Sequence, residues 1–311
     1  MTNALTRHNI CTILLGIAYI LPIPLLSQSR DSLANNPNLF IQLAAQQLHW
    51  EEPARPTRIV GPVYFVGTRG LASYLITSFA GHILLNTGMP SSGPMIDSNI
   101  RALGFHPEDI RYILSGHAHI DHVGGHAYMK RVSGADIVIM EAEKELLESG
   151  GKTDFQYGAY PAFHFEAVKA DHIVRDGDSI QLGDITMHAL LTAGHTMGST
   201  TWYFDVEDSA RMYHIVCPDG TTINPGYHLS VNPSYPGIQQ EYEQTFEGLS
   251  ELKPDIWLSP HTDFFQFDQK RRAAEKEGVK AYVDPAGYRK RIAGELQKFK
   301  AAVLREQQQR Q

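Results

Sequence analysis

Short apolar segments alternate with polar turns along the first third of the chain. Three of them, Arg58–Thr68, Ala72–Phe79 and His82–Gly88, are rich in β-branched and aromatic residues and are separated by turns that contain glycine. This pattern predicts three strands that open the fold. A helix is predicted over Gly93–Leu103, and the apolar run Ile110–Gly116 after it predicts a buried strand.

The second half of the chain repeats this plan without repeating the sequence. Strands are predicted at Ser179–Leu182, Ile185–Leu191, Thr200–Val206, Met212–Cys217 and Asp255–Ser259. Apolar residues recur every three or four positions within 238–252 and within 292–303, so each segment predicts a helix with one apolar face against the core. The pattern indicates an α/β fold of two packed sheets with helices outside and functional loops along one shared edge.

The amino terminus has a pattern of its own. A positively charged start at Arg7 precedes the apolar run Ile10–Leu26, which contains two prolines and is followed by the small polar residue Ser27. This order is typical of a secretory signal peptide, and the run is short and stiff for a membrane anchor. We therefore expect a signal peptide at 1–29, a single domain at 30–311, and a periplasmic or secreted protein without a membrane span.

Charge and cysteine content narrow the function classes further. The formal net charge is −7, and Lys and Arg are scattered along the chain, so the basic cluster typical of nucleic-acid binding is missing and no nucleic-acid partner is expected. Cys11 lies in the predicted signal peptide, which leaves Cys217 without a partner for an internal disulfide. Stability is therefore expected to come from packing or from metal.

Six consecutive residues carry the strongest chemical signal. The run HAHIDH at His117–His122 places three imidazoles and a carboxylate directly after a predicted strand. Imidazole nitrogen and carboxylate oxygen are zinc ligands, and this dense spacing favours metal binding over a loop of solvated histidines. His195 and His261 also follow strand-like runs. Each alone is typical of an ordinary histidine, but with the loop they give six ligands, enough for two metals that each keep an open position.

Longer motifs point to a known family. The segments HAHIDHVGGH, TAGHTMGSTTW and SPHTDFF occur in the order that resembles the metallo-β-lactamase superfamily. Further stretches, among them GGKTDFQYG, NPGYHLSVNPSYPGIQQEYEQTF and AYVDPAGYRKRI, resemble subclass B3 metallo-β-lactamases, which are exported zinc hydrolases of penicillins, cephalosporins and carbapenems. The resemblance runs from about Trp50 to Ile292. It implies a four-layer αβ/βα sandwich with mixed sheets and zinc at their shared edge.

The resemblance also implies roles for individual residues. Two zinc ions per chain would be held by two sets of ligands, the first being His117, His119 and His195 and the second being Asp121, His122 and His261. A hydroxide bridging the two ions would attack the amide bond of a small-molecule β-lactam and so give antibiotic resistance, with Asp121 as the catalytic residue that orients the hydroxide. A monomer is expected.

Substrate contacts are expected from two loops. The family usually carries serines after the strand that ends near Cys217, whereas this chain reads CPDGTTINPGY, so Thr221, Thr222 and Asn224 are the candidate donors. Phe155 and Tyr157, in the long loop 150–162, are expected to form a wall over the substrate.

Three positions depart from the family pattern or leave alternatives open. Asn86 stands where many relatives carry Asp, which is expected to weaken an anchor of the zinc loop. Cys217 is interpreted as a small buried residue. Asp219 is expected not to bind metal, so its replacement by Ala should be mild. If Asp219 bridges the metals, as in lactonase-like and glyoxalase-II-like members, lactones or thioesters become the substrates. A non-catalytic metal-binding protein is the remaining alternative.

Overall fold

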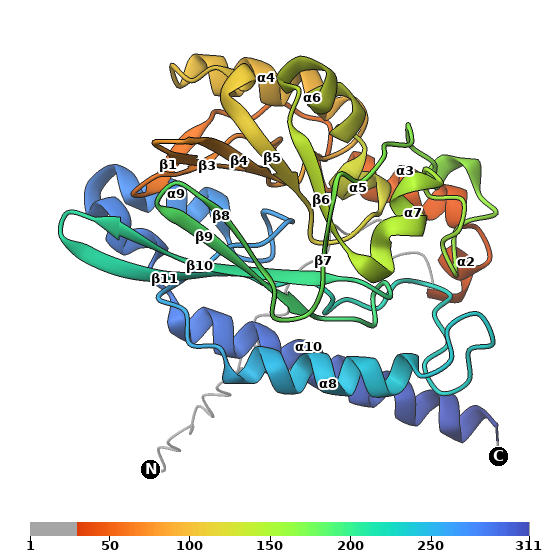
Figure 1. The fold of residues 1–311 in the computed structure, drawn as a ribbon. Helices are drawn as coiled ribbons and strands as arrows, with labels where there is room; N and C mark the ends of the chain where they lie inside the picture. Colours follow the sequence, from red (N-terminus) through yellow and green to blue (C-terminus); the bar gives the residue numbers. More distant parts are fainter. Residues whose placement is uncertain (1–29, 311) are drawn as a thin grey trace, which may run out of the picture.

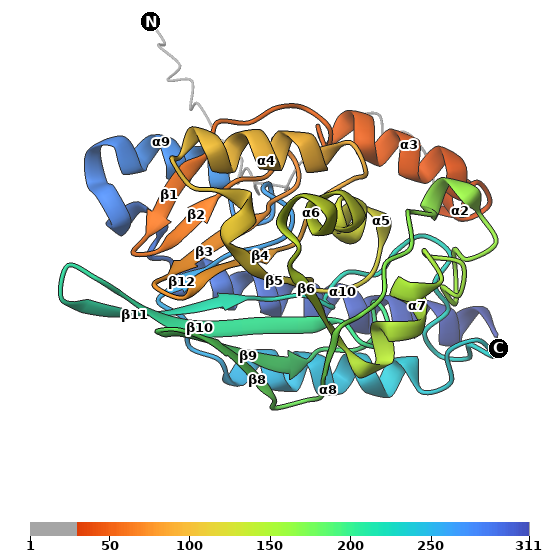
Figure 2. The ribbon, with the colours of Figure 1, turned by 45° about the horizontal axis from the view of Figure 1, so that its top comes forward.

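The computed structural model describes residues 30–310, and the expected signal peptide at 1–29 lies outside them. Two β-sheets pack face to face, with helices on their outer faces (Figures 1 and 2). The described part begins with helices α2 (Arg30–Ala34) and α3 (Pro37–Gln47). Asn36 caps α3, because its side chain accepts a hydrogen bond from the backbone N–H of Leu39.

The first sheet has seven strands in the order β1-β2-β3-β4-β5-β6-β7. The first four pair antiparallel as a meander, whereas β4 to β7 pair parallel, so the sheet is mixed. The strands are β1 (Thr57–Val60), β2 (Val63–Phe65), β3 (Tyr74–Ser78), β4 (Gly81–Leu85), β5 (Ile110–Leu114), β6 (Asp136–Met140) and β7 (His172–Val174).

The second sheet has five strands in the order β12-β11-β10-β9-β8, and it is mixed as well. Only β11 and β12 pair parallel in it, and the other neighbours are antiparallel. The strands are β8 (Ser179–Leu182), β9 (Ile185–Leu191), β10 (Thr200–Asp208), β11 (Arg211–Cys217) and β12 (Ile256–Trp257). Buried and less buried residues alternate along β9, so one face of this sheet points into the core.

Helices form the two outer layers. Those over the first sheet are α4 (Ser92–Ala102) and α6 (His126–Ser133), and those over the second are α8 (Ile238–Glu251) and α10 (Pro285–Gln309) (Figure 1). The remaining helical elements are α5 (Ile120–Val123), α7 (Lys144–Glu148), α9 (Phe267–Glu277), η1 (Pro107–Asp109), η2 (Glu141–Glu143), η3 (Pro161–Phe163) and η4 (Gly278–Tyr282). No helix within 30–310 is both long and apolar enough to span a bilayer.

The predicted architecture of two packed sheets with helices outside is confirmed, with differences in single elements. The strand predicted over Arg58–Thr68 is split into β1 and β2, because Gly61 adopts a left-handed φ of 47° and turns the chain. Strands β6 and β7 were not predicted, although β6 is as long as the predicted strands β3, β4 and β5. The apolar stripe predicted within 238–252 is buried along α8 as expected.

Hydrogen bonds between the two halves of the chain fix the edge at which the histidine loops meet. The N–H of Thr200 at the start of β10 donates to the carbonyl of Gly116 after β5, at 2.6 Å. The indole N–H of Trp202 donates to the carbonyl of Ser115 at 2.9 Å. The N–H of Ala72 donates to the carbonyl of Pro260 at 2.7 Å, beside His261. Loops that are far apart in sequence are thus joined at one edge of the sandwich.

Candidate metal centre

The HAHIDH loop begins where β5 ends and continues into the single turn of α5. It is anchored at Gly116, whose N–H donates to Oδ1 of Asn86 at 3.0 Å. Asn86 therefore keeps an acceptor for the loop at the position where the sequence predicted a weaker anchor. Its Nδ2 group is buried and has no hydrogen-bond partner among the described residues. Asn at this position therefore leaves one buried donor unsatisfied, which is unfavourable.

The first predicted ligand set, His117, His119 and His195, comes together in the structure with ligand atoms within 4.8 Å of one another. Each ring uses its outer nitrogen for a hydrogen bond to an oxygen. Nδ1 of His117 lies 3.0 Å from Oδ1 of Asp219, and Nε2 of His119 lies 3.0 Å from Oδ2 of Asp154. Nδ1 of His195 lies 2.8 Å from the carbonyl oxygen of Thr222.

These outer partners determine which nitrogen of each ring carries the proton. A carbonyl or a carboxylate oxygen only accepts hydrogen bonds, so the outer nitrogens donate and the inner nitrogens are left as lone pairs. Nε2 of His195 and Nδ1 of His119 then face each other at 3.1 Å as two acceptors. Nε2 of His117 is buried and has no partner within the described residues.

Such convergence of lone pairs fits a metal cation. Two nitrogens of a tetrahedral zinc site lie about 3.3 Å apart, given Zn–N bonds of about 2.0–2.1 Å. Burial and the neighbouring histidines hold the pKa of His117 well below its ordinary value, and burial lowers the pKa of His195 to about 3. Both rings are therefore neutral at pH 7 and present lone pairs to a metal.

The second predicted set, Asp121, His122 and His261, also comes together. Oδ2 of Asp121 lies 3.4 Å from Nε2 of His122 and 3.6 Å from Nε2 of His261. Burial alone would raise the pKa of Asp121, but the adjacent His122 and His261 outweigh burial and lower it. The carboxylate is therefore ionised and available to a cation at neutral pH.

Aromatic rings pack around the imidazole of His261. Its ring centroid lies 5.6 Å from that of Trp50 and 4.8 Å from that of Phe264. The guanidinium of Arg291 lies over the ring of Phe264, 3.8 Å from the ring centroid. Packing therefore holds this ligand in place.

Asp219 and Cys217 lie close to the cluster but differ in their contacts. Asp219 can be grouped geometrically with His117 and His122 as a third metal-ligand set, yet its carboxylate faces the outer nitrogen of His117. Cys217 is buried, as predicted, and burial raises the pKa of its thiol. It belongs to none of the metal-ligand groups found among the described residues.

Of the predicted substrate donors, Thr222 contacts the cluster directly, through His195. Thr221, Thr222 and Asn224 are partly exposed. The carbonyl of Thr222 accepts hydrogen bonds from His195 and from the hydroxyl of Tyr242, so this residue orients a candidate ligand through its backbone. A substrate contact from these side chains stays a prediction.

Of the two aromatic residues expected over the substrate, Tyr157 is buried and Phe155 is half-buried. Tyr157 is 1% exposed, stacks on Phe163 at 4.3 Å, and donates its hydroxyl to the carbonyl of Pro225. The ring of Phe155 contacts those of Tyr227 and Tyr235 at 4.9 and 5.0 Å. The ring of Tyr157 also lies 6.3 Å from that of His119, a candidate ligand. The expected role of both residues as a wall over the substrate stays a prediction.

Sequence analysis missed the residues that hold the histidine loops together. The buried carboxylate of Glu143 accepts the N–H of Ala118 at 2.7 Å and that of Gly198 at 2.8 Å. It thus joins the loop of His117 and His119 to the loop of His195. Tyr227 donates to the carbonyl of His195, and Thr245 donates to that of Ala193, both at 2.7 Å. No local sequence pattern marks these long-range contacts.

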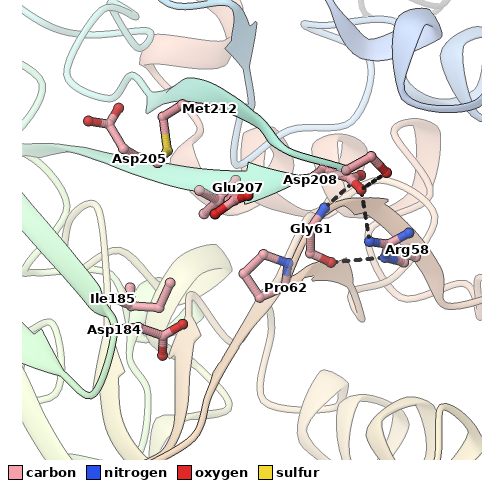
Figure 3. Close-up of a pocket in the computed structure, with 11 residues that line it drawn as sticks. Arg58, Gly61, Pro62, Asp184, Ile185, Asp205, Glu207, Asp208 and Met212 are labelled. Carbon is pink, nitrogen blue, oxygen red and sulfur yellow. Dashed lines mark hydrogen bonds and ion pairs between the residues drawn. The ribbon is translucent and has the colours of Figure 1, made fainter.

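A separate cavity of about 530 Å³, lined by none of the candidate metal ligands, lies between the turn after β1 and the β10–β11 hairpin (Figure 3). Its carboxylates include Asp208, which accepts the N–H of Gly61 at 3.1 Å and pairs with Arg58 at 3.5 Å. The residues that line it include neither histidine nor cysteine. This cavity therefore offers no counterpart to the candidate metal centre.

Solved structures resemble this chain over most of its length. The FEZ-1 metallo-beta-lactamase of Legionella gormanii is 34% identical, with a TM-score of 0.81, over 82% of this chain and 98% of that one. BJP-1, a subclass B3 metallo-beta-lactamase of Bradyrhizobium japonicum, is 33% identical, with a TM-score of 0.79, over 86% of this chain and all of that one. The resemblance to subclass B3 enzymes is thereby confirmed.

Curated relatives match more weakly. A probable metallo-hydrolase of Burkholderia pseudomallei is 30% identical over 112 residues, which is 36% of either chain. An N-acyl homoserine lactonase of a Bacillus species is 26% identical over 58% of this chain and 70% of its own length. The model of the metallo-beta-lactamase superfamily matches residues 66–261, a range that contains every candidate metal ligand described above. The chain belongs to the metallo-beta-lactamase superfamily, a family of metal-dependent hydrolases.

Proposed function

We propose that this protein is a β-lactamase of subclass B3 that uses two zinc ions to hydrolyse penicillins, cephalosporins and carbapenems. The observation that carries the proposal is the presence of two ligand sets, His117/His119/His195 and Asp121/His122/His261. They lie in a fold that matches the subclass B3 enzyme BJP-1 over the whole length of that enzyme. Zinc bound there would supply Lewis acidity toward the lactam carbonyl and lower the pKa of a water molecule.

The chain's own residues prepare this site in two ways. The outer hydrogen bonds of the three histidines in the first set hold their inner lone pairs toward one point, so little reorganisation is needed when a cation binds. Asp121 is ionised and 9% exposed, and its carboxylate would hold the second metal and orient the nucleophilic water.

Lactone hydrolysis is the second candidate. It is favoured by the similarity to the Bacillus lactonase and by Asp219, which lies in a third geometric group with His117 and His122. Against it stand the lower identity of 26% and the orientation of the Asp219 carboxylate toward an outer nitrogen. Thioesters form a third substrate class for the same fold.

A substrate panel tests the proposal. The purified, zinc-loaded protein is assayed with nitrocefin and a carbapenem, and in parallel with an acyl homoserine lactone and a thioester. We expect β-lactam hydrolysis with a kcat/KM at least about a hundredfold above that for the other classes, and loss of activity in a strong chelator. Preferential turnover of the lactone would reject the β-lactamase assignment in favour of the second candidate.

We also propose that the protein is exported to the periplasm or secreted and acts as a monomer on a small molecule. Support for export is the signal-like pattern of residues 1–29. Cell fractionation, with amino-terminal sequencing of the mature protein, tests the export. Light scattering of the purified protein tests the monomer, and a stable dimer would contradict it.

A further inference from the structure

The loop after β11 places a carboxylate behind the first ligand set. Both oxygens of Asp219 approach Nδ1 of His117, at 3.0 and 3.1 Å, although the two residues are 102 positions apart in sequence. The two side chains are only 3% and 7% exposed. In this setting a neutral imidazole N–H donates to a buried carboxylate, and the opposite nitrogen of the ring is left to face the ligand cluster.

The surroundings of Asp219 are shaped for this orientation. The N–H of Gly220 donates to Oδ1 at 2.6 Å, and the N–H of Asp219 itself donates to Oγ1 of Thr201 at 3.0 Å. Gly116 leaves the space for the carboxylate, because a Cβ at that position would lie 1.9 Å from Oδ2. The carboxylate is therefore held at a definite place by the backbone of two loops.

We propose that Asp219 is the positioning residue of the first metal site, fixing the ring and the tautomer of His117, and that it is not a ligand that bridges two metals. This inference rests on the proposed metal-dependent function. To become a bridging ligand, the carboxylate would have to leave both Nδ1 of His117 and the N–H of Gly220. Each of these donors would then remain buried without a partner, which is costly.

The inference changes the expectation for this residue. On sequence grounds, replacement of Asp219 by Ala should be mild. The contact with His117 instead predicts a lower affinity of the first site for zinc, by about 10- to 100-fold, as is usual when the partner of a metal-binding histidine is removed. Both metals should still bind at saturating zinc, because no ligand atom is lost.

The experiment compares Asp219→Ala and Asp219→Asn with the parent protein by zinc titration against a chromophoric chelator, and counts bound metal at saturation. Asp219→Asn keeps one oxygen for the N–H of His117, so its loss of affinity should be smaller than that of Asp219→Ala. Asp136→Asn is the matched control, because Asp136 pairs with Nε2 of His172 at 2.9 Å on the surface. Its zinc affinity should equal that of the parent.

A double-mutant cycle adds an independent check that does not depend on one variant. Gly116→Ala would displace the Asp219 carboxylate, so it should lower zinc affinity in the parent but have little further effect in the Asp219→Ala background. Additive effects of the two substitutions would contradict the proposal.

Two results in the titration would overturn the inference. If Asp219→Ala binds one metal equivalent fewer at saturating zinc, Asp219 is a metal ligand. If its zinc affinity equals that of the parent, Asp219 does not position His117 for metal binding. These readouts do not use a substrate. A protein that hydrolyses no β-lactam would therefore refute the proposed function while leaving the result for Asp219 valid.

Discussion

The two candidate ligand sets are built from similar residues but are held in different ways. In the first set, each histidine donates its outer N–H to an oxygen, supplied by Asp219, Asp154 or the carbonyl of Thr222. In the second set, the imidazoles of His122 and His261 contact the carboxylate of Asp121 and neighbouring rings.

This difference indicates how far each ligand set is organised before a metal binds. Hydrogen bonds to acceptors fix the tautomer and the plane of a ring, so the first set is organised before a cation arrives. Ring packing limits the movement of His261 but does not select which of its nitrogens carries a proton. The first set should consequently bind zinc more tightly than the second.

The largest effect is expected at Asp121, whose carboxylate lies between both histidines of the second set. Asp121→Asn keeps the size of the side chain and removes its charge, so the second metal should be lost and kcat should fall by at least about a hundredfold, with a smaller change in KM. Steady-state kinetics and metal analysis on the same preparation measure this. An Asp121→Asn enzyme with near-normal kcat would show that the second set is dispensable.

Graded metal removal tests the comparison itself. As the concentration of a competing chelator rises, zinc should leave in two steps, with affinities about 10- to 100-fold apart, and the second set should empty first. Cobalt substitution, followed by its absorption spectrum, assigns each step to a set. Simultaneous loss of both metals, or earlier loss from the first set, would contradict the stronger organisation of that set.

Much of the fold could be predicted because its signals are local. The strands Ser179–Leu182 and Ile185–Leu191 begin and end where the alternation of apolar residues predicts. The break between β1 and β2 could not be predicted with the same ease, because Gly61 and the following proline lie within an otherwise continuous apolar run. A single turn residue outweighs the strand propensity of its neighbours there.

The candidate ligands were also local signals, whereas their supports were not. His117, His119, Asp121 and His122 lie within six positions, so spacing alone marked them. Asp219 is 102 residues from His117, and Glu143 is 55 residues from Gly198. Contacts of this kind follow from the pairing of strands in two sheets, which no short window of sequence contains.

Glu143 offers a test of how the loops of the first set are joined. Its two oxygens accept separate N–H groups, from Ala118 and Gly198. Glu143→Gln retains one acceptor and turns an NH₂ group toward the other N–H, so the free energy of unfolding should fall by about 1–3 kcal/mol. Denaturant unfolding measures the change, with the exposed Glu145→Gln as the control. Equal stability of both variants would show that Glu143 does not join the loops.

The smallest effect is expected from the ring stack of the second set. Phe264 lies between the imidazole of His261 and the guanidinium of Arg291, with centroid distances of 4.8 and 3.8 Å. Phe264→Leu removes the aromatic face but keeps an apolar side chain, at a cost of about 0.5–1 kcal/mol, or roughly a two- to fivefold loss of zinc affinity. That loss should appear only in the first step of the chelator titration, in which the second set empties. Phe264→Tyr should restore the affinity because it restores the ring, and Phe79→Leu, at a residue that is 85% exposed, should have no effect. A loss confined to the second step, in which the first set empties, would mean that α10 and the stack support that set, and the contrast between hydrogen-bonded and packed ligands would have to be abandoned.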